Sequence, residues 1–353
     1  MPSRPYAGVV AVRGKMVLFS LLSSVIFGVI ALAGGTADAA DMDITPFSTF
    51  NQSPLVQIYG LPHDSSAGIA SPGTFLTSIS QDLSCNYSVS SNSREQMTLD
   101  GETYRLAFAV RYGVAPRWEV GVEIPYLSQG GGFLDSFVVS WHNTFGLPQG
   151  GRDSAPRDRM SYSYSKDGVQ KLTVEQAGSG VGDMSLTSGL SLYENSDDKS
   201  HDQLAVKAAL KLPTGDSSSL RGSGGTDFML QLCGSMTNFS EWGSLAVYGS
   251  VGALAMSKGD VLPDQHNQFA GVGTVGLGWG PASWISFKVQ LNGNTPLYRD
   301  SSLTELSKSP LLLILGGSLR FPGEYLLDIG VAEDVVVAAA PDVSFHLGLS
   351  KRF

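Results

Sequence analysis

The sequence is poor in the features that mark several familiar protein classes. Only two cysteines occur among 353 residues, Cys85 and Cys233, and with the five histidines they form no metal-type spacing, so a zinc site is excluded. The two thiols could pair in an oxidising compartment or stay separate on different strands. Charged residues make up 16% of the chain and the net charge is −9, which argues against nucleic acid as a partner.

Long apolar runs are also scarce. One lies near the N-terminus, and after it only short stretches such as Pro310–Leu315 occur, so a bundle of transmembrane helices is excluded. Hydrophobic residues still make up 42% of the chain, and glycine is abundant, with 42 residues. This mixture suits a β-barrel, in which each strand has one polar face and one lipid-facing face, so that averaged hydropathy does not detect the strand.

The first 39 residues have the layout of a secretory signal peptide. Arginine and lysine precede an apolar run from Met16 to Ala33, and Ala37–Ala39 gives a small-x-small cleavage pattern. An uncleaved anchor is the alternative, but a run of about 18 residues is marginal for a span. We therefore expect a signal peptide over residues 1–39, an N-terminal periplasmic arm or plug-like segment over 40–73, and an outer-membrane β-barrel over 74–353.

Most of the remaining chain alternates between apolar and polar side chains, which is the period of a strand and not of a helix. In the last stretch, apolar residues stand at every second position from Val343 to Phe353, apart from Lys351. We interpret such stretches as strands of a closed barrel that ends on Phe353. The same pattern occurs at residues 104–112, 117–126, 203–212, 285–292 and 325–331.

Connections of alternating length support the barrel and set its orientation. Outer-membrane barrels have short periplasmic turns and longer extracellular loops, so both termini are expected on the periplasmic side. The spacing predicts an all-β transmembrane antiparallel β-barrel of about 14 strands, within a range of about 12–16. Short connections are expected at residues 113–116, 166–168, 238–241, 280–281 and 321–323. Aromatic residues bracket most of them, as in an interfacial girdle: Tyr112, Trp118, Phe239, Trp242, Trp279, Trp284, Phe321 and Tyr325.

Charged residues on the polar faces of these strands are candidates for the lumen wall. They carry both signs, so they form no ring of one charge that would indicate ion selectivity. Mixed charges suit either a channel or salt bridges that fill a closed lumen. The predicted lumen-facing residues are Arg105, Arg111, Glu119, Glu123, Lys207, Lys211, Lys288, Arg320 and Asp328.

One stretch departs from the strand pattern. Large aromatic residues recur every four positions in a long loop, which predicts an amphipathic helix over residues 133–146. This helix could narrow the lumen, form a lid on the rim, or lie at the membrane interface. We expect it at or inside the extracellular mouth, where it would restrict passage. The predicted constriction consists of Phe133, Phe137, Trp141 and Phe145.

No motif points to an enzyme. The stretch Gly271–Gly276 has the glycine spacing of a dinucleotide site, but it lies inside a strand pattern and opens no helix. Glycines on the crowded face of a strand explain it better. We therefore predict no enzymatic activity, no cofactor and no metal, and retain an outer-membrane hydrolase only as a third hypothesis.

Several specific stretches resemble a family of Gram-negative outer-membrane proteins known only as domain of unknown function 3187. They include Asn51–Pro54 with Ile58–Pro62, residues 131–153, the KLPTGD and GSGGTDF pair within 211–228, and residues 332–345. The resemblance covers nearly all of the chain after the signal segment. It implies an outer-membrane barrel and no particular activity.

These patterns together predict an exported protein in the outer membrane of a Gram-negative bacterium. The favoured function is a channel or passive transporter for small solutes, and the alternative is a structural or assembly-related barrel with a filled lumen. The expected partners are outer-membrane lipid and the barrel-assembly machinery, which would recognise the C-terminal strand ending in Phe353. The sequence names no substrate.

Overall fold

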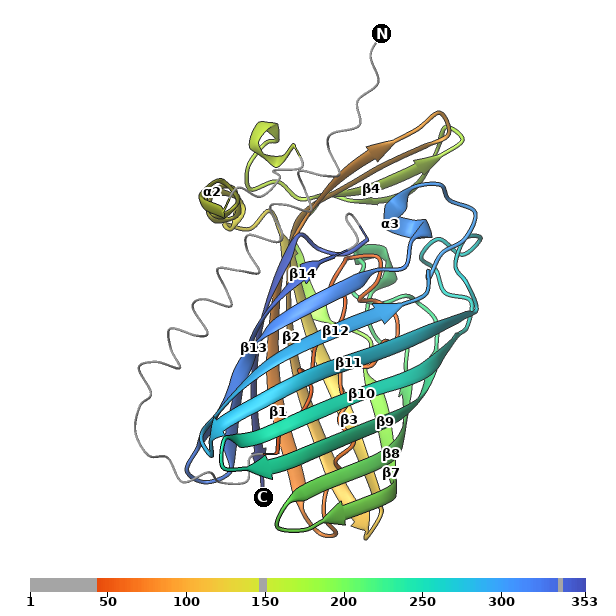
Figure 1. Ribbon diagram of the computed structural model, residues 1–353. Coiled ribbons are helices and arrows are strands. Elements are labelled where there is room, and N and C mark those ends of the chain that lie inside the picture. The colour runs from red at the N-terminus through yellow and green to blue at the C-terminus, as the bar shows by residue number, and fades with distance from the viewer. Residues whose placement is uncertain (1–42, 146–150, 336–338) are drawn as a thin grey trace.

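The computed structural model describes residues 43–145, 151–335 and 339–353, which form a closed antiparallel β-barrel (Figure 1). Twelve strands make the wall, and three further, shorter strands are added to it. The wall closes where the first strand, β1 (Phe75–Ser91), pairs with the last, β15 (Val343–Arg352). Among the described helices, none is long and apolar enough to cross a membrane. The predicted signal peptide lies outside the described residues.

The remaining wall strands follow one another around the barrel in chain order. They are β2 (Glu95–Ala115), β3 (Trp118–Gly130), β7 (Ser185–Ser196), β8 (Ser200–Lys211), β9 (Asp227–Ser240), β10 (Gly243–Met256), β11 (Phe269–Ala282), β12 (Ile285–Asn294), β13 (Leu311–Phe321) and β14 (Tyr325–Asp334). The other strands are β4 (Ser161–Lys166), β5 (Val169–Val174) and β6 (Gly178–Val181). The helices are α2 (Asp135–Phe145) and α3 (Thr304–Ser307), with single 3-10 turns η1 (Arg152–Ser154) and η2 (Ser217–Ser219).

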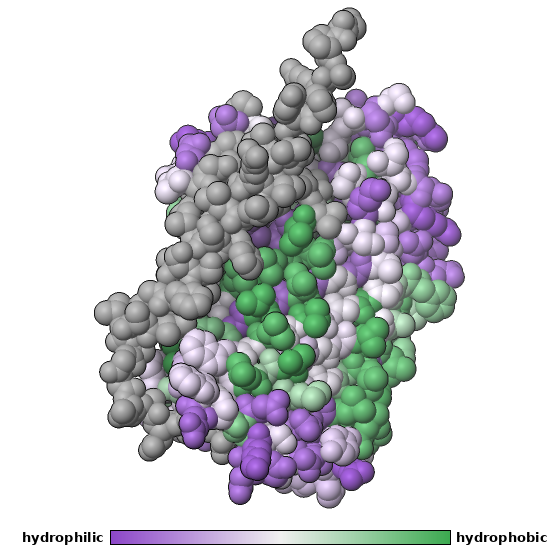
Figure 2. Space-filling model, in the orientation of Figure 1, coloured by the Kyte–Doolittle hydropathy of each residue, from purple (hydrophilic) through white to green (hydrophobic). Residues whose placement is uncertain are grey.

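Side chains alternate between the lumen and the outer face along each wall strand. On β12, Lys288 and Gln290 are buried inside, whereas Val289 between them is exposed on the outside. Figure 2 shows that hydrophobic residues cover much of the wall between more hydrophilic ends. Such an outward band is the surface that a barrel presents to lipid.

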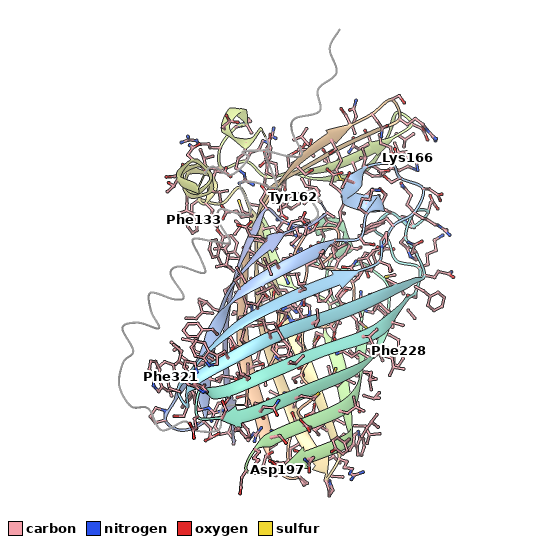
Figure 3. All side chains as sticks on the ribbon, viewed as in Figure 1. Phe133, Tyr162, Lys166, Asp197, Phe228 and Phe321 are labelled. Atoms are coloured by element: carbon pink, nitrogen blue, oxygen red, sulfur yellow. The ribbon has the colours of Figure 1, made fainter. Side chains whose placement is uncertain are left out.

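Exposed aromatic side chains lie near the short turns, as at a membrane interface, and turns this short are typical of the periplasmic end of an outer-membrane barrel. Phe239 departs from the predicted girdle, because it points inward and lines the lumen cavity. Figure 3 shows Phe321 and Asp197 at this end of the barrel. The exposed aromatic residues of the girdle are Tyr112, Trp118, Trp242, Trp284, Phe321, Tyr325 and Phe353.

The wall of twelve strands lies within the predicted range, but the central expectation of about fourteen was too high. The excess comes from β4 and β5, which the sequence pattern counted as wall strands. The turn at residues 166–168 joins these two strands at the extracellular end and is not periplasmic. β4 pairs with the first residues of β2, where β2 extends beyond the wall (Figure 1).

Residues 43–70, which we call the lumen segment, run inside the barrel. The segment enters beside the periplasmic end, where Asp43 contacts His201, and rises to the extracellular end, where Tyr298 donates a hydrogen bond to Leu55 O. It then descends to the start of β1, and Figure 1 shows it as the red-orange coil within the barrel. Most of its side chains are buried against the inner face of the wall.

The tip of the lumen segment lies in an apolar cluster that seals the extracellular end. The cluster joins the segment to β4, to the upper ends of several wall strands and to the loop around α3. Glu95 links β4 to the loop around α3, because it accepts hydrogen bonds from Tyr164 Oη (2.6 Å) and from Ser302 N (2.9 Å). The cluster includes Leu55, Tyr59, Met97, Tyr162, Tyr164, Leu254, Val261, Leu297, Tyr298 and Leu303.

Helix α2 does not lie in the lumen, so it does not form the predicted constriction. Its buried side chains, Leu134 just before the helix and Val138 within it, pack on outward-facing residues of β1, β14 and β15, so the helix lies outside the barrel. Phe137 contacts the outward-facing Phe345, with ring centroids 6.2 Å apart. Phe133 remains exposed beside the wall (Figure 3). A position against the lipid-facing wall gives these aromatic side chains apolar surroundings without a place in the lumen. The side chains of Trp141 and Phe145 lie outside the described residues.

Candidate functional site

The rising limb of the lumen segment is held by one row of side chains on β12. Gln290 accepts a hydrogen bond from Phe47 N (2.8 Å) and donates one to Phe47 O (3.3 Å). Lys288 donates to Thr45 O (3.0 Å), and Asn292 donates to Thr49 O (2.8 Å). Alternate side chains of β12 thus satisfy alternate backbone groups of the segment, which a buried backbone requires.

Lys288 also holds the limb through its charge. Its ammonium group lies 2.8 Å from Asp328 Oδ1 and 3.9 Å from the ring centroid of Phe47. The lysine and the aspartate neutralise each other, so this pair on the wall carries no surplus charge. The ring of Phe47 adds a cation–π contact to the hydrogen bonds around it.

Glycines on β11 make room for this packing. A Cβ atom at Gly278 would stand 2.5 Å from Ile44 Cγ2, and one at Gly276 would stand 2.3 Å from the Tyr248 ring. Only glycine allows such close approach. The glycine-rich stretch Gly271–Gly276 therefore belongs to a wall strand, as the sequence pattern indicated.

The KLPTGD and GSGGTDF stretches form a buried ionic cluster that grips the tip of the segment. Lys211 Nζ lies 2.6 Å from Asp183 Oδ2 and 3.2 Å from Asp227 Oδ2, and it donates a hydrogen bond to Ile58 O (3.2 Å). Asp227 in turn accepts from Gly60 N (2.9 Å). Two carboxylates face one ammonium group here, so the cluster has a surplus of negative charge.

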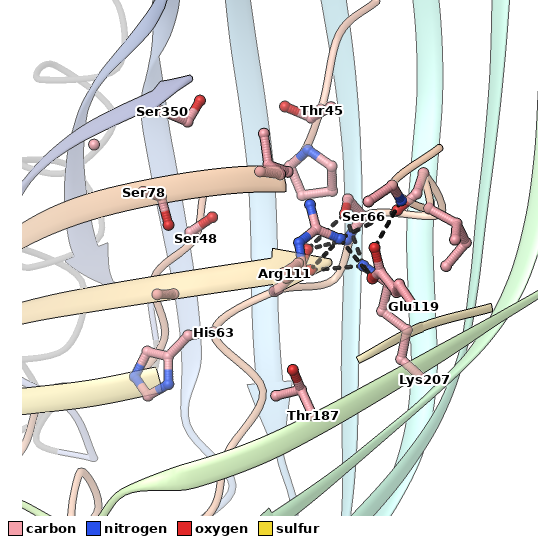
Figure 4. A pocket seen from close by; sticks show the side chains of 18 of the residues that line it. Thr45, Ser48, His63, Ser66, Ser78, Arg111, Glu119, Thr187, Lys207 and Ser350 are labelled. Carbon is pink, nitrogen blue, oxygen red and sulfur yellow. Dashed lines mark hydrogen bonds and ion pairs between the residues drawn. The ribbon is translucent and has the colours of Figure 1, made fainter. Parts of the chain in front are cut away.

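The falling limb is held by a second cluster, formed by Asp64 of the segment and three wall residues. Figure 4 labels the wall residues Arg111, Glu119 and Lys207. Asp64 Oδ2 lies 3.0 Å from Arg111 Nη1 and 2.6 Å from Lys207 Nζ. Glu119 Oε1 lies 2.9 Å from the same Arg111 nitrogen, and Glu119 Oε2 accepts from Ala70 N (2.7 Å). Burial raises the pKa of Asp64, but Arg111 and Lys207 outweigh burial and hold this pKa well below its usual range.

A third chain of charges crosses the lumen near His63, which belongs to the segment. Arg105 pairs with Glu123, and Asp82 accepts from His346 Nδ1 (2.7 Å) and from Thr49 Oγ1 (2.8 Å). His63 Nδ1 lies 3.6 Å from Glu123 Oε1. Burial and the nearby Arg105 lower the pKa of His63 to about 4, so this imidazole is neutral at neutral pH.

A cavity of about 570 Å³ with a mixed polar and apolar lining remains in the lumen, below the sealed end. It reaches the periplasmic turns, because Asp197 and Glu324 line it, and it extends upward past the Asp64 cluster to Gly60 and Lys211. Hydroxyl side chains share its lining with the charged groups, among them Ser48, Ser78, Thr187 and Ser350 (Figure 4). Among the described residues, no group of three or more histidine, cysteine, aspartate or glutamate residues could hold a metal ion.

The structure places the predicted lumen residues in five locations. Arg111, Glu119 and Lys207 form one cluster, and Arg105 and Glu123 pair beside it. Lys288 pairs with Asp328, and Lys211 lies in the extracellular cluster. Arg320 lines the periplasmic end of the cavity.

Sequence reasoning missed the partners that the lumen segment contributes. Asp64 and His63 lie in a stretch rich in turn residues, where no alternation assigns a face. Gln290 and Asn292 were visible as the polar face of a strand, but they carry no charge and were not selected. Both cysteines are free, with Cys85 on the outer face below α2 and Cys233 on the inner face.

The chain belongs to the family described as "Protein of unknown function (DUF3187)", whose family model matches residues 20–353. This confirms the resemblance seen in the sequence. Its fold is similar to the crystal structure of the COG4313 outer membrane channel from Pseudomonas putida F1, with a TM-score of 0.51 and 14% identity over 84% of this chain and 98% of that chain.

Two further solved structures are less similar. They are the NanC porin, with a TM-score of 0.40 and 10% identity over 78% of this chain and 98% of that one, and the translocator domain of the autotransporter NalP from Neisseria meningitidis, with 0.39 and 12% over 80% and 88%. A comparison with curated proteins gave no match. The likeness to the COG4313 channel shows the fold, which is that of an outer-membrane β-barrel.

Proposed function

We propose that this protein is an outer-membrane channel for small solutes whose lumen is closed by its own residues 43–70. The observation that carries the proposal is the cavity of about 570 Å³, which the lumen segment and its apolar seal separate from the extracellular side. The segment is not part of the wall, so its displacement would join the cavity to the outside and leave the barrel closed around it. Passive diffusion needs no catalytic group, which is consistent with the absence of enzymatic activity that we predict.

The filled structural barrel is the second hypothesis, and the buried ion pairs favour it. Breaking a buried pair costs about 3–5 kcal/mol, so clusters such as Lys211 with Asp183 and Asp227 resist rearrangement. The two hypotheses differ in one property. A channel conducts once the lumen segment is released, and a structural barrel does not.

Single-channel recording in planar bilayers distinguishes them. Deleting residues 43–70 should give stable open channels with conductance well above that of the intact protein. Retained heat-modifiability on gels would show that the wall still folds. A folded deletion variant without conductance would overturn the channel. Phe137→Ala is the matched control, because α2 lies outside the barrel and its change should leave conductance unaltered.

A reversible tether tests the gate without removing it. A Cβ atom at Gly278 would lie 3.3 Å from Ile44 Cβ, close to the separation of about 3.8 Å that disulfides prefer. Ile44→Cys with Gly278→Cys, in a background with Cys85→Ala and Cys233→Ala, should stay closed when oxidised and regain openings when reduced. Equal opening in both states would show that the segment does not control passage.

A further inference from the structure

The Asp64 cluster is unusual among the charge clusters of the lumen. With the lumen segment removed, the wall groups that remain there are Arg111, Lys207 and Glu119, which are two cations and one anion. Asp64 supplies the second carboxylate, so only the segment brings this cluster to neutrality.

The other clusters do not share this property. Lys288 is balanced by Asp328 on the wall, and Lys211 faces two carboxylates, Asp183 and Asp227. Arg105 lies between Glu123 and Asp82. Among these buried clusters, surplus positive charge on the wall therefore exists only beside Asp64.

Asp64 of the lumen segment binds to the wall cations of this cluster through one carboxylate oxygen. Its Oδ2 atom bridges Arg111 and Lys207, while its Oδ1 atom takes its hydrogen bonds from the segment itself, at Ser66 N (2.9 Å) and Ser66 Oγ (2.6 Å). The wall thus holds one negatively charged oxygen through a hydrogen bond from Lys207 and an ion pair with Arg111. Gln231, paired opposite Lys207, donates to the backbone oxygen of Asp64 (2.7 Å) and would become a third free donor after release.

We propose that Arg111 and Lys207 form a binding site for small carboxylate anions in the open lumen, and that Asp64 occupies this site as an internal ligand when the channel is closed. The proposal rests on the channel function above and names its solute class. Glu119 limits the surplus to a single positive charge, which matches a monocarboxylate better than a phosphate dianion. A charge-assisted hydrogen bond from Lys207, together with the ion pair to Arg111, gives a carboxylate a defined position, which one diffuse cation would not.

Asp64→Asn tests the site directly. The amide keeps the shape of the side chain and removes its charge, so the wall site is left with one surplus positive charge. In a potassium chloride gradient, the variant should open more often than the intact protein, and its reversal potential should shift towards anion selectivity. Potassium acetate should reduce the chloride current through the open variant.

Lys207→Gln in the Asp64→Asn background should weaken the acetate effect about tenfold or more and should return the permeability ratio towards unity. Arg320→Gln in the same background removes one positive charge from the same cavity but not from the site, and should preserve the acetate effect. If Asp64→Asn stays closed, the same two substitutions are compared in the variant that lacks residues 43–70.

The outcomes separate the two proposals. Open channels in which Lys207→Gln and Arg320→Gln act alike would overturn the carboxylate site and leave the gated channel standing. Absence of current from both the Asp64→Asn and the deletion variants, with the wall folded, would overturn the channel itself.

Discussion

The barrel wall and the lumen segment are held by different kinds of hydrogen bond. Wall strands pair with one another through continuous backbone ladders, such as the register from Leu76 to Cys85 across the closing seam. The backbone of the segment is instead bound by side chains, from the wall at Thr45, Phe47, Thr49 and Ile58 and from the loop after β12 at Leu55. Removing the segment therefore leaves the described ladders of the wall intact.

This difference follows from the surroundings that the backbone groups of each part would face if their hydrogen bonds were broken. An opened wall would expose unpaired backbone groups to lipid, each at a cost of several kcal/mol, so the wall must remain closed. The segment faces a polar lumen, where water can replace the hydrogen bonds it gives up. The residues that join the segment to β1 are the exception. Gly113 N donates to Thr74 O, and Gly113 O accepts from Gly73 N. The contact is close, because a Cβ at Gly113 would stand 2.1 Å from Ser71 O. The segment is thus fixed to the wall at its periplasmic end.

The largest expected effect tests the wall. Deleting Val343–Phe353 removes the strand that pairs with both β1 and β14, so the barrel has two open edges and should not insert. We also expect the assembly machinery to require this strand. Fractionation and protease resistance measure the result, with the deletion of residues 43–70 as the comparison that should still insert. A truncated protein that inserts and resists protease would contradict the seam seen here.

A smaller effect is expected at the apolar seal. Leu55 is 2% exposed, and Leu55→Ala leaves a cavity that should weaken docking of the segment by about 2–5 kcal/mol. About 2 kcal/mol corresponds to a rise in the ratio of open to closed time of roughly 30-fold in single-channel records. Leu277→Ala is the matched control, because Leu277 is 59% exposed on the outer face, where lipid can fill the space. Equal gating in the two variants would argue that the seal does not hold the segment.

The wall could be predicted from the sequence because its physics is periodic. Alternation assigned Glu119 and Lys288 to the lumen, since a strand places every second residue on one face. The same rule failed for β4 and β5, which alternate like wall strands but pair with an extension of β2. Alternation identifies a strand and its faces, but it does not tell which strands a sheet will place beside each other.

The lumen segment and α2 could not be predicted in the same way. Residues 43–70 follow the shape of a lumen that exists only after the wall closes, so no local pattern places Asp64 between Arg111 and Lys207. The aromatic stripe predicted the α2 helix but not its position. Leu134 and Val138 determine which face of the helix packs on the wall. The prediction placed the aromatic side chains in the mouth to remove them from water, but the lipid-facing surface of the wall also gives them apolar contact.

The smallest expected effect is a response to acid, and it tests whether the segment is docked through its titratable groups. His63 has a docked pKa of about 4, below its ordinary value of about 6.5, and the pKa of Asp64 is also lowered. Neither residue belongs to a membrane-spanning strand. Because both groups bind protons more tightly after release, acid favours the released segment.

The contribution of His63 should be lost as pH falls from about 6.5 towards 4, and that of Asp64 only below about pH 4. Open probability should rise on the order of tenfold over the first range, since water in the cavity screens part of the effect. His63→Gln should flatten this range and keep the steeper rise below it. The groups that face the two residues are Asp82, Arg105, Glu123 and His346 around His63, and Arg111, Glu119 and Lys207 around Asp64. An unchanged profile in His63→Gln would assign the acid response to these wall groups, and the segment would then be held mainly by its backbone contacts and its apolar tip.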